Sequence, residues 1–131
     1  MAMARFKPTG ADAEVATMFR HAGGAMSTTI SSLDNGGPNV AMVLGTKARI
    51  EVANVWYQPT SFRVIGPDEK TIEDYRSNVP GRGMQYQAAE LERLVAEGKI
   101  AGDILPPQES VAIMEALDAV RAQIGLKYPG E

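Results

Sequence analysis

The chain has no cysteine among its 131 residues, which excludes disulfide frameworks, thiolate metal sites and cysteine nucleophiles together. It has a single histidine, His21, placed beside Gly23 and Gly24 with no paired carboxylate nearby in the sequence. A lone histidine at a turn is more often a surface residue than a general base. We therefore predict no catalytic residue and no metal ligand in this chain.

Positive charge and long apolar runs are also missing. Lys and Arg number 13 against 16 Asp and Glu, the net charge is -3, and no basic run occurs, so a nucleic-acid partner is not expected. No stretch approaches the roughly 18 apolar residues of a membrane span, and the first ten residues lack the apolar centre of a signal peptide. The composition favours a cytoplasmic protein with no nucleic-acid or membrane partner.

What remains is an ordinary globular composition, with 44% apolar and 22% charged residues. A chain of this length is expected to form one domain that buries roughly two thirds of the surface of its unfolded form. We therefore predict a single domain over residues 1–131.

The first 75 residues read as strands joined by turns, since apolar and polar residues alternate between Gly, Pro and Asn clusters. Three hairpins are predicted, with strands over 12–20 and 25–33, then 40–44 and 49–56, then 61–66 and 70–75. The run VAMVL at 40–44 is apolar without interruption, so both of its faces require cover.

Helical spacing replaces this pattern from Met84 onward. Apolar residues recur every three or four positions over 84–97 and over 108–124, with Gly98 and Gly125 as stops. Strands first and helices last predict an α+β fold, a largely antiparallel, open-faced sheet of about six strands with two C-terminal helices on one face. The other face of the sheet then needs a partner.

The segment PGRGMQYQ, residues 80–87, is the one place where polar groups converge on a helix start. It is not a dinucleotide fingerprint, because the third glycine of that motif would fall at position 86, which is Tyr. Free backbone N–H groups beside Arg82 favour an anionic or hydroxyl-rich group, and Gln85 and Tyr86 can add hydrogen bonds. A packed Tyr86 and a solvated Arg82 are the structural alternative.

The glutamates of the same helix, Glu90, Glu92 and Glu97, have no histidine at ligand spacing. We interpret them as a solvated face rather than as a metal site.

Four stretches, in order, carry a resemblance to a known family: PTGADAEVATMFRHAGGAMSTTISSL, VLGTKARIEV, GRGMQYQAAELERLVAEGK and ESVAIMEALDAVRAQIGLKYPGE. Together they resemble the C-terminal domain of the Gfo/Idh/MocA family of NAD(P)-dependent oxidoreductases, in its dihydrodiol dehydrogenase-like branch. The hairpin turn departs from that pattern, with Ala48 where the family usually has glycine.

The resemblance implies a parent enzyme that transfers hydride between NAD(P) and a sugar, polyol or diol. In that family a preceding Rossmann domain holds the nucleotide and supplies a lysine from a Glu-Lys-Pro segment; neither occurs in these 131 residues. The chain is then expected to bind substrate and to oligomerise, with no cofactor and no turnover of its own.

Substrate contacts are expected from Arg82, Gln85 and Tyr86. The family often has histidine or glutamate at the positions of Gln85 and Gln87, and a glutamine cannot shuttle protons near neutral pH. These glutamines would therefore orient substrate.

Many family members pair the open face of this sheet with a second subunit, which implies a homo-oligomer with Val40, Met42 and Leu44 in the interface. Two alternatives stay open. The chain could be a stand-alone sheet-pairing interaction module without catalysis, or an unrelated α+β ligand-binding domain.

Overall fold

A computed structural model describes residues 1–128 and residue 130. It contains seven strands followed by two helices: β1 (Ala2–Phe6), β2 (Asp12–Arg20), β3 (Met26–Ser32), β4 (Ala41–Leu44), β5 (Arg49–Val52), β6 (Phe62–Ile65), β7 (Thr71–Tyr75), α1 (Met84–Ala96) and α2 (Pro107–Ile124). All strand pairs are antiparallel, so the predicted α+β class and the three hairpins are confirmed.

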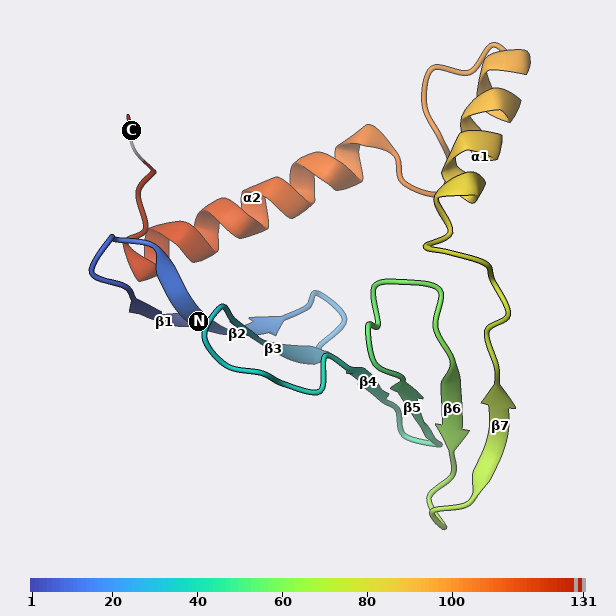
Figure 1. Ribbon diagram of the computed structural model, residues 1–131, viewed down its shortest axis with the longest axis horizontal. Helices are drawn as coiled ribbons and strands as arrows, with labels where there is room; N and C mark the ends of the chain where they lie inside the picture. Colours follow the sequence, from blue (N-terminus) through green and yellow to red (C-terminus); the bar gives the residue numbers. More distant parts are fainter. Residues whose placement is uncertain (129, 131) are drawn as a thin grey trace. The chain divides into compact units, whose positions relative to one another are not determined.

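The strands form two hydrogen-bonded sheets, one with the order β1-β2-β3 and the other with the order β4-β5-β6-β7. The chain correspondingly forms two compact units, one of residues 1–36 and 101–131, and one of residues 37–100 (Figure 1). We expected about six strands in one sheet. Pairing stops after β3 because Gly36, Gly37 and Pro38 follow, and proline cannot donate to a ladder.

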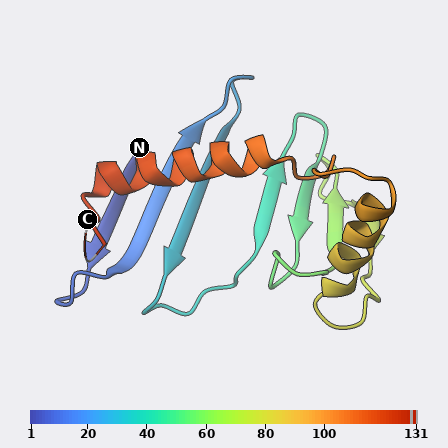
Figure 2. The same cartoon turned by 90° about the horizontal axis from the view of Figure 1, so that it is seen from above.

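The first unit is a helix packed on a three-stranded sheet, and α2 lies across its strands (Figure 2). Beneath the helix, β1 presents small side chains: Ala2 and Ala4 are half-buried, whereas Met3 is exposed. Ala13 of β2 is only 1% exposed. Small residues let the helix approach the sheet closely, which explains why an alanine is the most deeply buried side chain here.

The other face of this sheet is open and rich in methionine. The register places Met3, Met18 and Met26 on one side, and Met1 joins them through its backbone bonds to Met18. All four side chains are exposed. Strand β1 itself was not predicted, because five residues of alternating small and large side chains give a weak local signal until β2 pairs with them.

The second unit is a four-stranded sheet with two different faces. Directly opposed residues share a face, so the pairs Ala41–Val52 and Phe62–Tyr75 define an apolar face, on which the two aromatic rings stack at 5.0 Å. The pairing of Glu51 with Arg63 defines a charged face. Ile65 is the one buried large side chain among the described residues of this unit, at 4% exposure.

Two further features of the second unit differ from expectation. β5 ends at Val52 rather than at position 56, because Val55 adopts a left-handed conformation with φ 59° that a strand cannot contain. Helix α1 has the predicted start. Neither helix has a buried residue, but α2 packs on β1, whereas α1 packs closely on none of the described strands.

Candidate functional site

The start of α1 is fixed by a glycine that no other residue can replace without cost. Gly83 caps the helix with φ 76°, and its carbonyl accepts the Tyr86 N–H at 3.1 Å. A Cβ at this position would lie 2.7 Å from Cγ of Pro59. The backbone of the helix start is thus pressed against the loop between β5 and β6, and both a left-handed φ and the close approach require glycine.

The three predicted substrate contacts all lie at this helix start. Gln85 donates from Nε2 to the carbonyl of Pro80 at 3.4 Å, and Tyr86 is exposed. Arg82 lies in the turn between two left-handed glycines, Gly81 and Gly83, and is exposed as well. Gln85 and Tyr86 are about 100° apart around the helix. Their role in binding stays a prediction.

The loop that touches Gly83 contains two aromatic residues that sequence reasoning missed. Trp56 and Tyr57 are both exposed, and their rings meet edge to face at 5.8 Å. Beside them, the strained Val55 is held by two bonds from its N–H, to the Asn54 side chain at 2.9 Å and to the Asn39 carbonyl at 3.0 Å. A β-branched residue in this conformation costs energy, and such strain is concentrated at functional sites.

The local sequence does not predict this loop, because valine and tryptophan favour strands. The one available signal was Pro59, which cannot sit in a central strand.

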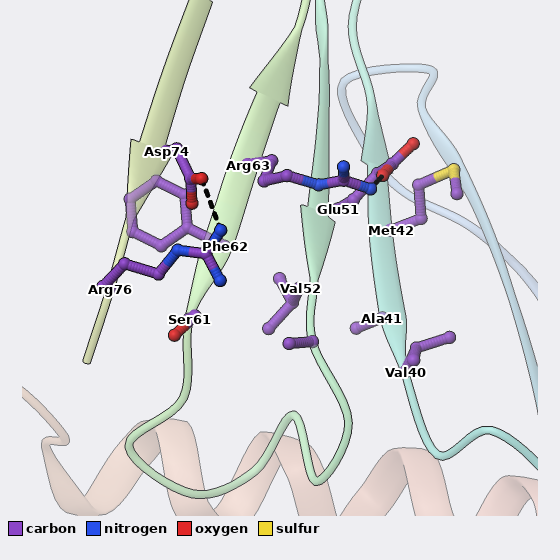
Figure 3. Close-up of a pocket in the computed structure, with 11 residues that line it drawn as sticks. Val40, Ala41, Met42, Glu51, Val52, Ser61, Phe62, Arg63, Asp74 and Arg76 are labelled. Carbon is purple, nitrogen blue, oxygen red and sulfur yellow. Dashed lines mark hydrogen bonds and ion pairs between the residues drawn. The ribbon is translucent and has the colours of Figure 1, made fainter. Parts of the chain in front are cut away.

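A pocket of about 470 Å³ lies in the unit of the four-stranded sheet, and residues of both faces line it (Figure 3). Val40 and Met42 line it together with two ion pairs. Arg63 pairs with Glu51 at 2.8 Å, and Arg76 pairs with Asp74 at 2.6 Å. None of Arg82, Gln85 and Tyr86 lines this pocket, whereas two of the three predicted interface residues do.

Charge on the charged face is balanced by a connected network. Arg49 bonds Glu51 at 2.8 Å and holds both oxygens of Glu69 at 2.6 and 2.8 Å. The hydrogen bond from Arg49 is the main cause that lowers the pKa of Glu51, with a smaller contribution from Arg63. Both carboxylates of the network therefore stay ionised at neutral pH, and the guanidiniums screen them from one another.

The other candidate features, which are His21, a metal site and a membrane-spanning helix, give weaker evidence of function. His21 Nε2 lies 2.9 Å from the Ser27 hydroxyl in the first hairpin, with both groups near the surface. Over residues 1–128 and 130, no three histidine or acidic side chains gather closely enough to hold a metal ion. Neither helix of the described chain combines the length and the apolarity needed to cross a bilayer.

Similarity to known proteins covers nearly the whole chain. It is 29% identical over 133 aligned residues to trans-1,2-dihydrobenzene-1,2-diol dehydrogenase of Mus musculus, an alignment that covers 98% of this chain and 39% of the relative. The Xenopus tropicalis protein of the same name is 25% identical, over 92% of this chain and 38% of its own. D-xylose 1-dehydrogenase (NADP(+)) of Hypocrea jecorina is 30% identical over 66% of this chain and 24% of its own.

No family model matches the chain. The chain spans about two fifths of the length of the dihydrodiol dehydrogenases that it matches. At 98% of the chain, the alignment with the Mus musculus protein extends over both units.

Proposed function

This chain is homologous to dehydrogenases of the Gfo/Idh/MocA family, and from that premise we propose that it is the substrate-binding and oligomerisation domain of an NAD(P)-dependent oxidoreductase. The parent enzyme would act on a diol, polyol or sugar. Both compact units would belong to this one C-terminal domain. The observation that carries the proposal is similarity to dehydrogenases over 98% of the chain.

In this proposal the nucleotide is bound mainly by a Rossmann domain outside these residues. The hydride chemistry then belongs to NAD(P), and this chain contributes binding and orientation. The helix start at Gly83 and the loop from Val55 to Pro59 would form one wall of the substrate cleft. There, Arg82, Gln85 and Tyr86 offer hydrogen bonds to hydroxyl groups, and Trp56 offers a flat apolar surface for a ring.

The test is a fluorescence titration with NADPH and NADH on the 131-residue chain and on the product of its full reading frame. We expect micromolar binding and dehydrogenase activity with diols or sugars only for the full product. Micromolar binding by the 131 residues alone would contradict the assignment of the nucleotide to another domain. A full product that is inactive toward diols, polyols and sugars would contradict the proposed function.

Oligomerisation is proposed through the charged face of the four-stranded sheet. Val40, Met42 and Leu44 lie on that face, because Met42 is paired with Glu51, and they are 49%, 54% and 75% exposed. Balanced charges of both signs beside an apolar strip suit a face that pairs with its own copy, since each charge then meets its opposite across a two-fold axis.

A charge placed in the apolar strip should separate the subunits. Met42→Glu with Leu44→Glu should lower the association constant at least tenfold in sedimentation equilibrium. Val43→Glu is the matched control for Met42→Glu alone, because Val43 is 59% exposed on the opposite face of the same strand. Equal effects of the two changes, or a monomeric unmodified chain at high concentration, would contradict this interface.

A further inference from the structure

The asparagines of this chain differ in the residue that follows them. Asn35 precedes Gly36, whereas Asn39, Asn54 and Asn78 each precede a valine. The side-chain amide of an asparagine lies within reach of the next peptide nitrogen, and attack by that nitrogen closes a five-membered ring. Glycine leaves the nitrogen unhindered and the backbone free to turn, whereas a β-branched valine crowds it. The sequence therefore sets Asn35 apart from the other asparagines.

Local contacts leave the attacking nitrogen of this pair available. Asn35 and Gly36 follow β3 and belong to the first unit, outside its helix and strands. The N–H of Asn35 donates to the Ser32 hydroxyl at 3.1 Å. The Gly36 N–H, in contrast, makes no hydrogen bond with the described residues of that unit. Ring closure at Gly36 therefore breaks no backbone hydrogen bond there.

The amide under attack is weakly held, and the charges around it are balanced. Asn35 Nδ2 donates to Glu14 Oε1 at 3.3 Å, just beyond the usual range for such a bond. Arg5 and Lys7 pair with Asp34 at 3.2 and 2.6 Å. Arg5 also lies 3.6 Å from Glu14. Ring closure passes through a negatively charged nitrogen, and these cations offset the carboxylates that would disfavour that charge.

We propose that Asn35 is a site of spontaneous deamidation, at which water is the co-reactant and aspartate or isoaspartate is the product. The Gly36 nitrogen bonds to Cγ of Asn35, the bond from Cγ to Nδ2 breaks, and the Gly36 proton leaves with the amide as ammonia. Water then opens the ring. Cleavage of the new bond to Cγ gives aspartate, whereas cleavage of the original peptide bond gives isoaspartate, in which the main chain runs through Cγ.

The reaction changes one of the two segments that join the units, since the first unit ends at Gly36 and the second begins at Gly37. Either product adds one negative charge to a chain of net charge -3. In aspartate, an anionic oxygen replaces the donor that faces Glu14, so this contact changes from attraction to repulsion. In isoaspartate, the main chain between β3 and β4 is one carbon longer. The segment thus undergoes a slow covalent change in charge or in both charge and length.

Peptide mass spectrometry of the full reading-frame product, kept folded in a mildly alkaline buffer, tests this proposal. We expect Asn35 to convert on the order of tenfold faster than the three asparagines that precede valine. Gly36→Val should slow Asn35 to the rate of those three. Gly37→Val is the matched control, since it adds the same side chain one residue later, and neither glycine has a positive φ. This control should leave the rate at Asn35 unchanged.

Three results would overturn the proposal. The first is equal conversion at Asn35 and at the asparagines that precede valine. The second is conversion that begins only after urea has unfolded the protein. The third is equal slowing by Gly36→Val and Gly37→Val, which would show that the conformation of the loop, and not the Asn35–Gly36 pair, sets the rate. A sample digested without incubation measures the conversion that occurs during handling and is subtracted.

Discussion

The two units of this chain stabilise their sheets by different means. In the first, α2 packs on β1, and Ala13 of the neighbouring strand β2 is buried at 1% exposure. In the second, α1 packs closely on none of the four described strands, and the sheet relies on its ladder, on Ile65 and on the network centred on Arg49. Neither helix has a buried residue, so the two units differ in whether a helix packs on the sheet.

The largest expected effect comes from placing a charge beneath α2. Ala13→Glu should destabilise the first unit by about 3 to 5 kcal/mol, the usual cost of an uncompensated buried charge. Urea denaturation measures the loss, and hydrogen exchange should show it in β1 to β3 and α2 while β4 to β7 keep their protection. Ala16→Glu, on the open face of the same strand, is the control. Simultaneous loss of both units would mean that they are not independent in stability.

A smaller effect is expected at the helix start of the second unit. Gly81 and Gly83 both have positive φ, but only Gly83 lies against another residue. Gly81→Ala should therefore cost about 1 to 2 kcal/mol for the left-handed backbone alone. Gly83→Ala should cost more, because Pro59 must also move. Thermal denaturation of the two variants measures the difference between their losses of folding free energy. Equal losses would show that Pro59 moves aside without a measurable cost.

The smallest effect concerns the charged face. The folded-state pKa of Glu51 lies below its ordinary value of 4.5, so the carboxylate stabilises the fold above that pH, and this contribution is lost as pH falls through the lowered pKa. Stability of the unmodified chain should decline more steeply below pH 4.5 than that of the Glu51→Gln variant. Denaturation midpoints from pH 7 to pH 3 test this, and parallel curves would mean that the network does not contribute.

Most local structure could be predicted from the sequence. The strand over 12–20 has the predicted bounds, and both helices begin within one residue of their predicted starts. These elements have strong local periodicity and glycine stops at Gly98 and Gly125. Resemblance to the family was likewise carried by continuous segments, and the similarity to curated dehydrogenases confirms it.

What could not be predicted depends on contacts distant in sequence. The conformation of Val55 follows from bonds to Asn54 and Asn39, and the need for glycine at position 83 follows from Pro59. The apolar spacing of α1 predicted a helix packed on the sheet, because periodicity identifies an apolar side without identifying what covers it. The role of Arg82, Gln85 and Tyr86 in substrate binding stays a prediction.

The open face of the three-stranded sheet exposes the thioethers of Met1, Met3, Met18 and Met26. Unbranched methionine side chains change rotamer at little energetic cost, so this face can pack against surfaces of different shapes. Thioethers also react with oxidants, and the sulfoxide is polar and chiral where the methionine was apolar. Peroxide exposure would therefore make this face more polar, whereas the opposite face of the same sheet, which carries Ala2 and Ala4, has no methionine to oxidise.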